Sequence, residues 1–256
     1  MTAVQPERWL IREPTVAGSA RLFCFPPAGV GASAFRRWPR HVGRLEVCPV
    51  QLPGRENRIR ERPYREFEEF AAGAASGLRP YFDRPFAFFG HCMGAILVHT
   101  LLARLHDQGD PVPFRLYVSS SLAPHLGFFG PFHPSMSDAR LADGLRNNVR
   151  ALGEEQPIPE LIELSVRILR NDVEMFYRRR PPAPRRLPCP VSTIAWSDDP
   201  NVRPEQMAGW RECGEVTQHS LLAGDNLTFL TAPSPLLAAI ELDSRPAAAS
   251  ANWKTG

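Results

Sequence analysis

The sequence predicts a mostly parallel α/β sheet with helices on both faces and one inserted helical segment. Short apolar runs bounded by glycine and proline recur at residues 22–25, 45–52, 86–89, 116–118, 191–196 and 216–222. Amphipathic stretches with a helical period, such as 67–78 and 95–106, lie between several of these runs. Strands that alternate with helices favour a parallel sheet covered on both sides.

This alternation breaks between about residues 127 and 190. Two helical patterns, 137–152 and 159–178, follow each other there with no strand between them. We therefore assign residues 1–127 and 189–242 to the core and residues 128–188 to a helical insertion, a candidate lid over the carboxyl edge of the sheet. The alternative is that these helices only complete the core. The tail, 243–256, is rich in Ala, Ser and Pro and is expected to be disordered.

Composition excludes several classes of function. The net charge of +3 is mild, and Lys254 is the only lysine among 30 basic residues, so a nucleic-acid surface is not indicated. The five cysteines are odd in number, scattered and without C-x-x-C spacing, which argues against a disulfide framework and a zinc site. The N-terminus has no apolar segment typical of a signal peptide, and no apolar run reaches about 18 residues. A cytoplasmic protein without membrane or nucleic-acid partners is expected.

The sequence GHCMG, residues 90–94, follows the apolar run 86–89 and precedes a helical pattern. This is the setting of the G-x-S-x-G nucleophile turn, with a thiol in place of the hydroxyl. Gly90 and Gly94 allow the crowded backbone of a sharp turn, and Cys92 would stand at a helix N-terminus, where the helix dipole lowers a thiol pKa. We interpret Cys92 as a nucleophile, whereas Cys24 and Cys48 lie within strand patterns and are expected to be core residues.

A second loop, FPPAGVG at residues 25–31, follows the first apolar run. It is not followed by Gly-Lys-Ser/Thr, so a phosphate-binding loop is disfavoured. In an α/β-hydrolase this loop supplies one oxyanion donor, and the residue after the nucleophile supplies the other. The backbone N–H groups of Ala28 and Met93 are therefore the candidate oxyanion hole.

Six segments carry a family resemblance: FCFPPAGVGASAFRRW, VQLPGRENR, FGHCMGA, VSSSLAPH, LRND and GDNLTFL. Their order resembles that of the landmarks of type II thioesterases, which are α/β-hydrolases similar to the terminal thioesterase domains of polyketide and nonribosomal peptide synthetases. The likeness covers about residues 8–242. It implies an α/β-hydrolase fold, a mobile lid at 128–188, and action on acyl or aminoacyl thioesters held on the phosphopantetheine of a carrier protein, with no cofactor of the enzyme's own.

The family's catalytic triad is Ser, Asp and His in chain order, and this sequence departs from it twice. Asp199 matches the acid, with Asp198 as the runner-up and a turn or helix-capping carboxylate as the alternative reading of both. Cys92 stands for the serine, and Asn226 stands where the family has its histidine. The Asn226 amide could hydrogen-bond Asp199 without transferring a proton.

No other histidine is a convincing replacement for the missing base. The family directs His91 away from the chemistry, His219 lies within a strand pattern, and His133 on the lid is left as an open candidate. His41, His99 and His106 are interpreted as helix or surface residues. His125 matches a position that the family shares.

These substitutions lead to a hypothesis of acyl transfer or cyclisation through Cys92 rather than hydrolysis, because a thiol attacks without a strong base whereas water does not. Editing hydrolysis of aberrant acyl groups is one alternative, and a non-catalytic protein that binds the carrier or intermediate is another. Phe128, Phe129 and Phe132 suggest an apolar acyl substrate. Arg179 and Arg180 form a candidate docking rim for an acidic acyl or peptidyl carrier protein, although a solvated face is the common fate of such a run. The chain is expected to be a monomer.

Overall fold

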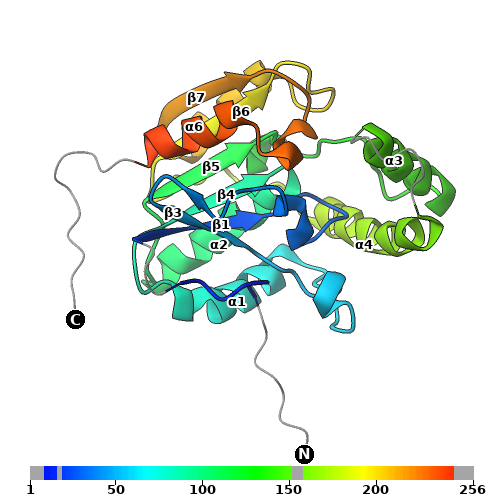
Figure 1. Ribbon diagram of the computed structural model, residues 1–256, viewed down its shortest axis with the longest axis horizontal. Coiled ribbons are helices and arrows are strands. Elements are labelled where there is room, and N and C mark those ends of the chain that lie inside the picture. Colours follow the sequence, from blue (N-terminus) through cyan, green and yellow to red (C-terminus); the bar gives the residue numbers. More distant parts are fainter. Residues whose placement is uncertain (1–8, 16–18, 152–157, 245–256) are drawn as a thin grey trace, which may run out of the picture.

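The computed structural model describes residues 9–15, 19–151 and 158–244. Its centre is a seven-stranded sheet of order β2-β3-β1-β4-β5-β6-β7 (Figure 1). The strands are β1 (Ala20–Phe25), β2 (His41–Val42), β3 (Leu45–Pro49), β4 (Phe86–His91), β5 (Arg115–Ser119), β6 (Val191–Trp196) and β7 (Val216–Leu222). All neighbouring pairs are parallel except β2 with β3. The α/β fold predicted from the alternation of strands and helices is confirmed.

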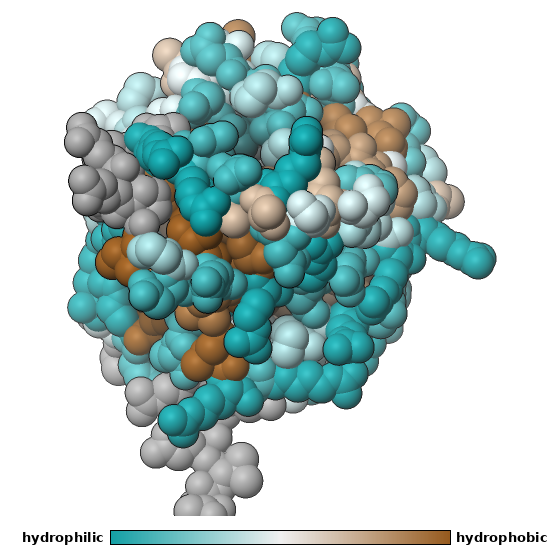
Figure 2. Space-filling view, turned by 90° about the vertical axis from the view of Figure 1, so that its right-hand side faces the viewer, coloured by the Kyte–Doolittle hydropathy of each residue, from teal (hydrophilic) through white to brown (hydrophobic). Residues whose placement is uncertain are grey.

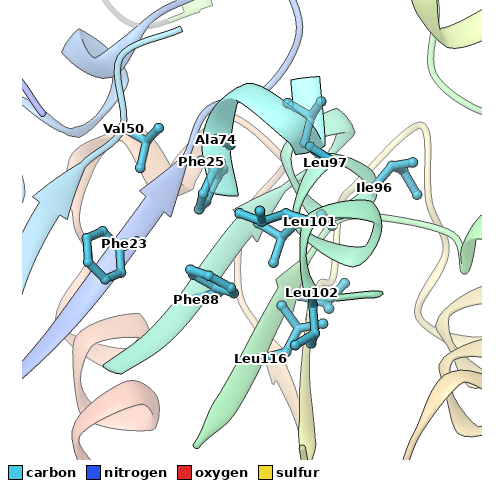
Figure 3. Packing of buried hydrophobic residues seen from close by; sticks show 14 of the residues in the cluster. Phe23, Phe25, Val50, Ala74, Phe88, Ile96, Leu97, Leu101, Leu102 and Leu116 are labelled. Atoms are coloured by element: carbon cyan, nitrogen blue, oxygen red, sulfur yellow. The ribbon is translucent and has the colours of Figure 1, made fainter. Parts of the chain in front are cut away.

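Side chains of the central strands alternate between the two faces of the sheet. Phe23 and Phe25 of β1 pack with Phe88 of β4 against helices α1 (Phe67–Leu78) and α2 (Met93–Gln108), as Figure 3 shows. Leu22 and Cys24 point to the other face, which α6 (Ser234–Asp243) covers. Both faces of β1 and β4 are therefore buried, which explains why these strands are continuous apolar runs.

Parallel strands end at one edge of the sheet, and the segments that follow β1, β4, β5, β6 and β7 carry the candidate site. Short 3-10 turns lie at Ala32–Phe35, Glu56–Arg58, Arg79–Tyr81, Pro124–Leu126, Pro204–Gly209 and Thr228–Thr231. The second follows β3, the third follows α1, and the other four belong to the segments that carry the site. A one-turn helix, α5 (Trp210–Cys213), follows the fifth of them.

The insertion consists of helices α3 (Asp138–Ala151) and α4 (Pro159–Arg178), which lie side by side at one end of the sheet (Figure 1). They share an apolar cluster of their own, formed by Leu141, Ala142, Leu145, Ile162, Val166, Leu169 and Val173. Figure 2 views the molecule from this side and shows apolar surface gathered among polar side chains. The helical nature of the insertion is as expected, and its mobility stays a prediction.

The expected disordered tail lies mostly outside the described residues. Its first residue, Asp243, instead ends α6.

Candidate active site

Cys92 occupies the turn between β4 and α2. Its φ of 52° and ψ of −120° are unusual for a residue with a side chain. The Cys92 N–H donates to the Ser119 carbonyl at the end of β5 (2.9 Å), and a Cβ on Gly94 would collide with the Phe25 carbonyl oxygen. The surrounding structure thus holds a strained turn, as is common at functional sites.

The turn opens on a small apolar cavity of about 50 Å³. Ala28, Cys92 and Met93 form its core side, and the sequence prediction that these three lie together agrees with this geometry. The lid side is formed by Phe129, Gly130, Pro131, Phe132, Asp172, Val173, Phe176 and Tyr177.

Phe128 lies apart from the other two phenylalanines of this loop. Its ring is 39% exposed and stacks on Tyr177 with centroids 4.4 Å apart, outside the residues that line the cavity. Of the three phenylalanines that suggest an apolar substrate, Phe129 and Phe132 line the cavity, and their role in binding stays a prediction.

Burial raises the pKa of the Cys92 thiol to about 12, and the negative charge of Asp199 adds to this shift. The Met93 N–H bonds to the sulfur and acts in the opposite direction, as expected at a helix N-terminus. The predicted lowering of this pKa is therefore wrong. Desolvation of the thiolate outweighs the stabilisation from the helix, although Cys92 keeps part of its surface exposed.

Asp199 follows β6, is buried, and has its carboxylate fully engaged inside the protein. It accepts hydrogen bonds from the Ser120 hydroxyl and from the backbone N–H groups of Asn201 (2.8 Å) and Val202 (3.2 Å). Asp198 is exposed and accepts a bond from the Ser197 hydroxyl (2.9 Å), so of the two carboxylates only Asp199 is buried, and its role as the acid stays a prediction.

Asn226 lies in the turn after β7, and its backbone hydrogen-bonds His91, the residue before Cys92. Asn226, the position matched to the family's histidine, therefore lies beside the turn that carries Cys92. Within the described parts of the chain, however, no hydrogen bond joins the Asn226 amide to Asp199. The Ser120 hydroxyl donates to the Asp199 carboxylate instead.

All seven histidines fall within the described residues, and none hydrogen-bonds the Cys92 sulfur. His91 is buried, lies 3.0 Å from the Ser119 hydroxyl and stacks on Phe229. His133 is exposed and accepts a bond from the Ser135 N–H (3.1 Å), so the open candidate is turned to a local partner. The one histidine that faces a carboxylate in these regions is His125, 3.3 Å from Glu212.

The two rim arginines differ in their surroundings. Arg179 is partly buried, donates to the carbonyls of Pro124 (2.7 Å) and Gly127 (3.1 Å), and lies over the Phe176 ring. This argues against Arg179 as a docking side chain, because its guanidinium braces the start of the insertion. Arg180 is exposed.

Sequence reasoning missed several polar residues beside the site. Gln51, Arg55 and Asp172 are buried and hydrogen-bonded to one another or to the loop after β1. Their segments, VQLPGRENR and LRND, were visible as landmarks but carried no chemical role. Ser120 has a φ of 53° and was hidden within a run of three serines.

The described residues contain no group of three or more His, Cys, Asp or Glu side chains that could hold a metal ion. In the same residues, no helix has the length and apolar character needed to cross a membrane.

A parallel sheet with a strained nucleophile turn after its fourth strand, an acid after its sixth and an inserted helical pair defines an α/β-hydrolase. The Thioesterase domain family matches residues 20–242, and the chain belongs to this family. It is thus an enzyme of the thioesterase family, whose members are acyl-thioester hydrolases.

Individual relatives support this assignment. The chain is 32% identical to "Linear gramicidin dehydrogenase LgrE" of Brevibacillus parabrevis over 94% of each chain. A solved structure, RedJ, a thioesterase from the prodiginine biosynthetic pathway in Streptomyces coelicolor, is 33% identical, with a TM-score of 0.75 over 93% of this chain and 99% of that one. The type II thioesterase BorB from the borrelidin biosynthetic cluster is 29% identical, with a TM-score of 0.75 over 91% and 96% of the two chains.

Proposed function

We propose that this protein is a type II thioesterase-like enzyme of polyketide or nonribosomal peptide biosynthesis that accepts an acyl or peptidyl group on Cys92. The group comes from the phosphopantetheine of a carrier protein and is released to a nucleophile other than water. That acceptor is another carrier's thiol, an amine, or a carbon of the same acyl chain. The biosynthetic relatives support the pathway. The carrier-bound substrate is proposed from the family resemblance of the sequence, and the enzyme is proposed to need no cofactor of its own.

The observation that carries this proposal is the distribution of the histidines. All seven are described, none bonds the sulfur, and Asn226 stands in the turn where the triad would place its imidazole. A serine in this setting would be disabled, whereas a thiol is intrinsically nucleophilic. Hydrolysis of an acyl-enzyme needs a base to activate water, and an amide does not accept a proton at neutral pH.

Transfer of the acyl group to Cys92 needs no external base to take up a proton. The bond between the Cys92 sulfur and the acyl carbon forms, the bond from that carbon to the carrier's sulfur breaks, and the proton of Cys92 ends on the departing thiol. The backbone N–H groups of Ala28 and Met93 would stabilise the intermediate oxyanion, each by about 3 kcal/mol. One thioester replaces another, so the activation of the acyl group is conserved.

Intact-protein mass spectrometry with an acyl-carrier substrate tests the proposal. We expect an acyl adduct on the wild type, none on Cys92→Ala, and slow release of free acid. Asn226→His should raise the rate of hydrolysis by at least about tenfold, since a general base typically contributes 10²–10⁴-fold. Rapid hydrolysis by the wild type, or no change in Asn226→His, would contradict the account and favour editing hydrolysis.

A second candidate, non-catalytic binding of the carrier or its intermediate, is favoured by the raised pKa of the Cys92 thiol, which leaves little thiolate at neutral pH. Cys92→Ala discriminates the two functions. Full retention of product formation in the producing organism would establish binding, and its loss together with the acyl adduct would establish covalent catalysis.

A further inference from the structure

A buried ion pair joins the insertion to the core directly behind the candidate oxyanion loop. Arg55 lies in the segment after β3, and Asp172 lies on α4; their side chains are 4% and 0% exposed. The pair is bidentate, with Nη1 to Oδ2 at 2.9 Å and Nη2 to Oδ1 at 2.7 Å. Such geometry fixes the two side chains in orientation as well as in distance.

The same two side chains hold the loop after β1 from both sides. Asp172 Oδ2 accepts a hydrogen bond from the Gly29 N–H (2.9 Å), and Arg55 Nη1 donates to the Val30 carbonyl (2.9 Å). Gly29 has a φ of 81°, and Leu169 of α4 packs against the place where a Cβ would stand. The peptide that links Ala28 to Gly29 is thereby held in place, and Ala28, whose own N–H lies on the preceding peptide, lines the same cavity as Cys92.

Stability does not explain the pair. Replacing a buried ion pair with well-packed apolar side chains of similar volume is often neutral or stabilising, because burial desolvates both charges. A neighbouring amide supports a role in loop geometry, since Gln51 accepts from the Ala32 N–H (2.8 Å) and donates to the Arg55 carbonyl (2.9 Å). The polar groups of this region therefore converge on the loop of residues 28–32.

We propose that Arg55 and Asp172 are positioning residues that aim the Ala28 N–H at the oxyanion formed when Cys92 attacks an acyl group. They act through the Gly29 peptide and touch no substrate atom. Because Asp172 belongs to α4, the oxyanion hole is complete only while α4 is docked. The inference rests on the proposed function only in taking Cys92 as the attacking atom.

The test compares two reactions of Cys92 that differ in the need for an oxyanion hole. With p-nitrophenyl acetate, the sulfur–acetyl bond forms, the ester C–O bond breaks, p-nitrophenolate leaves with the electron pair, and the thiol proton goes to buffer. Iodoacetamide alkylates the same sulfur by displacement of iodide and develops no oxyanion. Cys92→Ala gives the background of both reactions.

Two variants are measured at pH 9. Asp172→Asn leaves Arg55 without its counter-charge, and the double variant R55M/D172L replaces the pair with apolar side chains that are expected to pack. We expect the p-nitrophenolate burst to slow by about 10- to 100-fold in both, while alkylation stays within about twofold of the wild type. Glu174→Gln, which removes an exposed partner of Arg178 on the same helix, should change neither rate.

A burst in R55M/D172L within twofold of the wild type would overturn the proposal. So would an equal fall in both reactions, which indicates general disruption, or a wild type without a Cys92-dependent burst. Failure of the proposed function is distinguishable, because it would appear as an unloaded wild type with carrier thioester while the ester burst remained.

Discussion

At the scale of single residues, Cys92 combines a strained backbone with a partly buried thiol whose pKa is raised. The strain presents the sulfur at the start of α2, where the Met93 N–H bonds to it. Burial and the charge of Asp199 keep the thiol protonated, in contrast to a thiol at an open helix N-terminus. Burial raises the pKa of the Cys92 thiol and the Met93 hydrogen bond lowers it, and burial has the larger effect.

This balance predicts a steep pH dependence of Cys92 alkylation. Burial places the pKa of the thiol at about 12, so the thiolate fraction should rise about tenfold per pH unit between pH 7 and pH 10. The measurement is the rate of iodoacetamide labelling, followed by mass spectrometry, with Cys92→Ala as background and glutathione as a reference thiol. A plateau of the protein rate below pH 9 would show that the thiol is activated instead.

At the scale of elements, the nucleophile turn depends on the close approach of α2 to β1. A Cβ on Gly94 would collide with the Phe25 carbonyl oxygen and would lie 2.8 Å from the Pro26 carbonyl oxygen. Both are backbone atoms, which cannot move aside as a side chain can. The contact therefore couples the nucleophile turn to the oxyanion loop.

We expect Gly94→Ala to lower the free energy of unfolding by about 3 kcal/mol, the upper end of typical overpacking effects. Gly109→Ala at the other end of α2 is the matched control. Gly109 has open space around it and a φ of 68°, so an alanine there should cost about 1 kcal/mol of backbone strain. Urea unfolding of both variants gives the comparison, and equal losses would refute the packing argument.

Elements with strong local signals could be predicted from the sequence. The bounds of α1, α4, β6 and β7 coincide with the predicted ranges, because apolar periodicity and flanking Pro or Gly residues mark their ends. The two-residue strand β2 and the one-turn helix α5 were not predicted, since neither is long enough to show a period. Helix α6, which follows the last landmark, was not predicted either.

The residues of the candidate site that lie within sequence motifs could be predicted, whereas the properties that depend on tertiary contacts could not. The loop and turn motifs brought Ala28, Cys92 and Met93 together correctly. The direction of the thiol's pKa shift depends on how much the folded chain desolvates it, and the pairing of Arg55 with Asp172 joins segments far apart in the sequence. Neither the pKa shift nor this ion pair can be predicted from the spacing of residues along the sequence.

At the scale of the whole molecule, two buried histidines link stability to pH. Burial lowers the pKa of His91 to about 3 and that of His99 to about 4, and the positive charges of Arg179 and Arg185 add to the shift of His99. Bonds to the backbone of Asn226 and Arg185 oppose these shifts but do not cancel them. In the unfolded chain both groups take up a proton near pH 6.5.

The unfolded state therefore binds more protons than the folded state between about pH 6.5 and pH 4, and stability falls as the pH falls through this range. Each histidine contributes up to about 1.4 kcal/mol per pH unit, or about 2 kcal/mol between pH 7 and pH 5. Urea unfolding at these two pH values should show a smaller loss in His99→Gln than in the wild type, and a smaller one still in H91Q/H99Q. The same pH dependence in all three proteins would mean that carboxylates alone govern acid unfolding. A further reduction in H91Q/H99Q beyond His99→Gln would assign part of this pH dependence to His91, the residue that precedes Cys92.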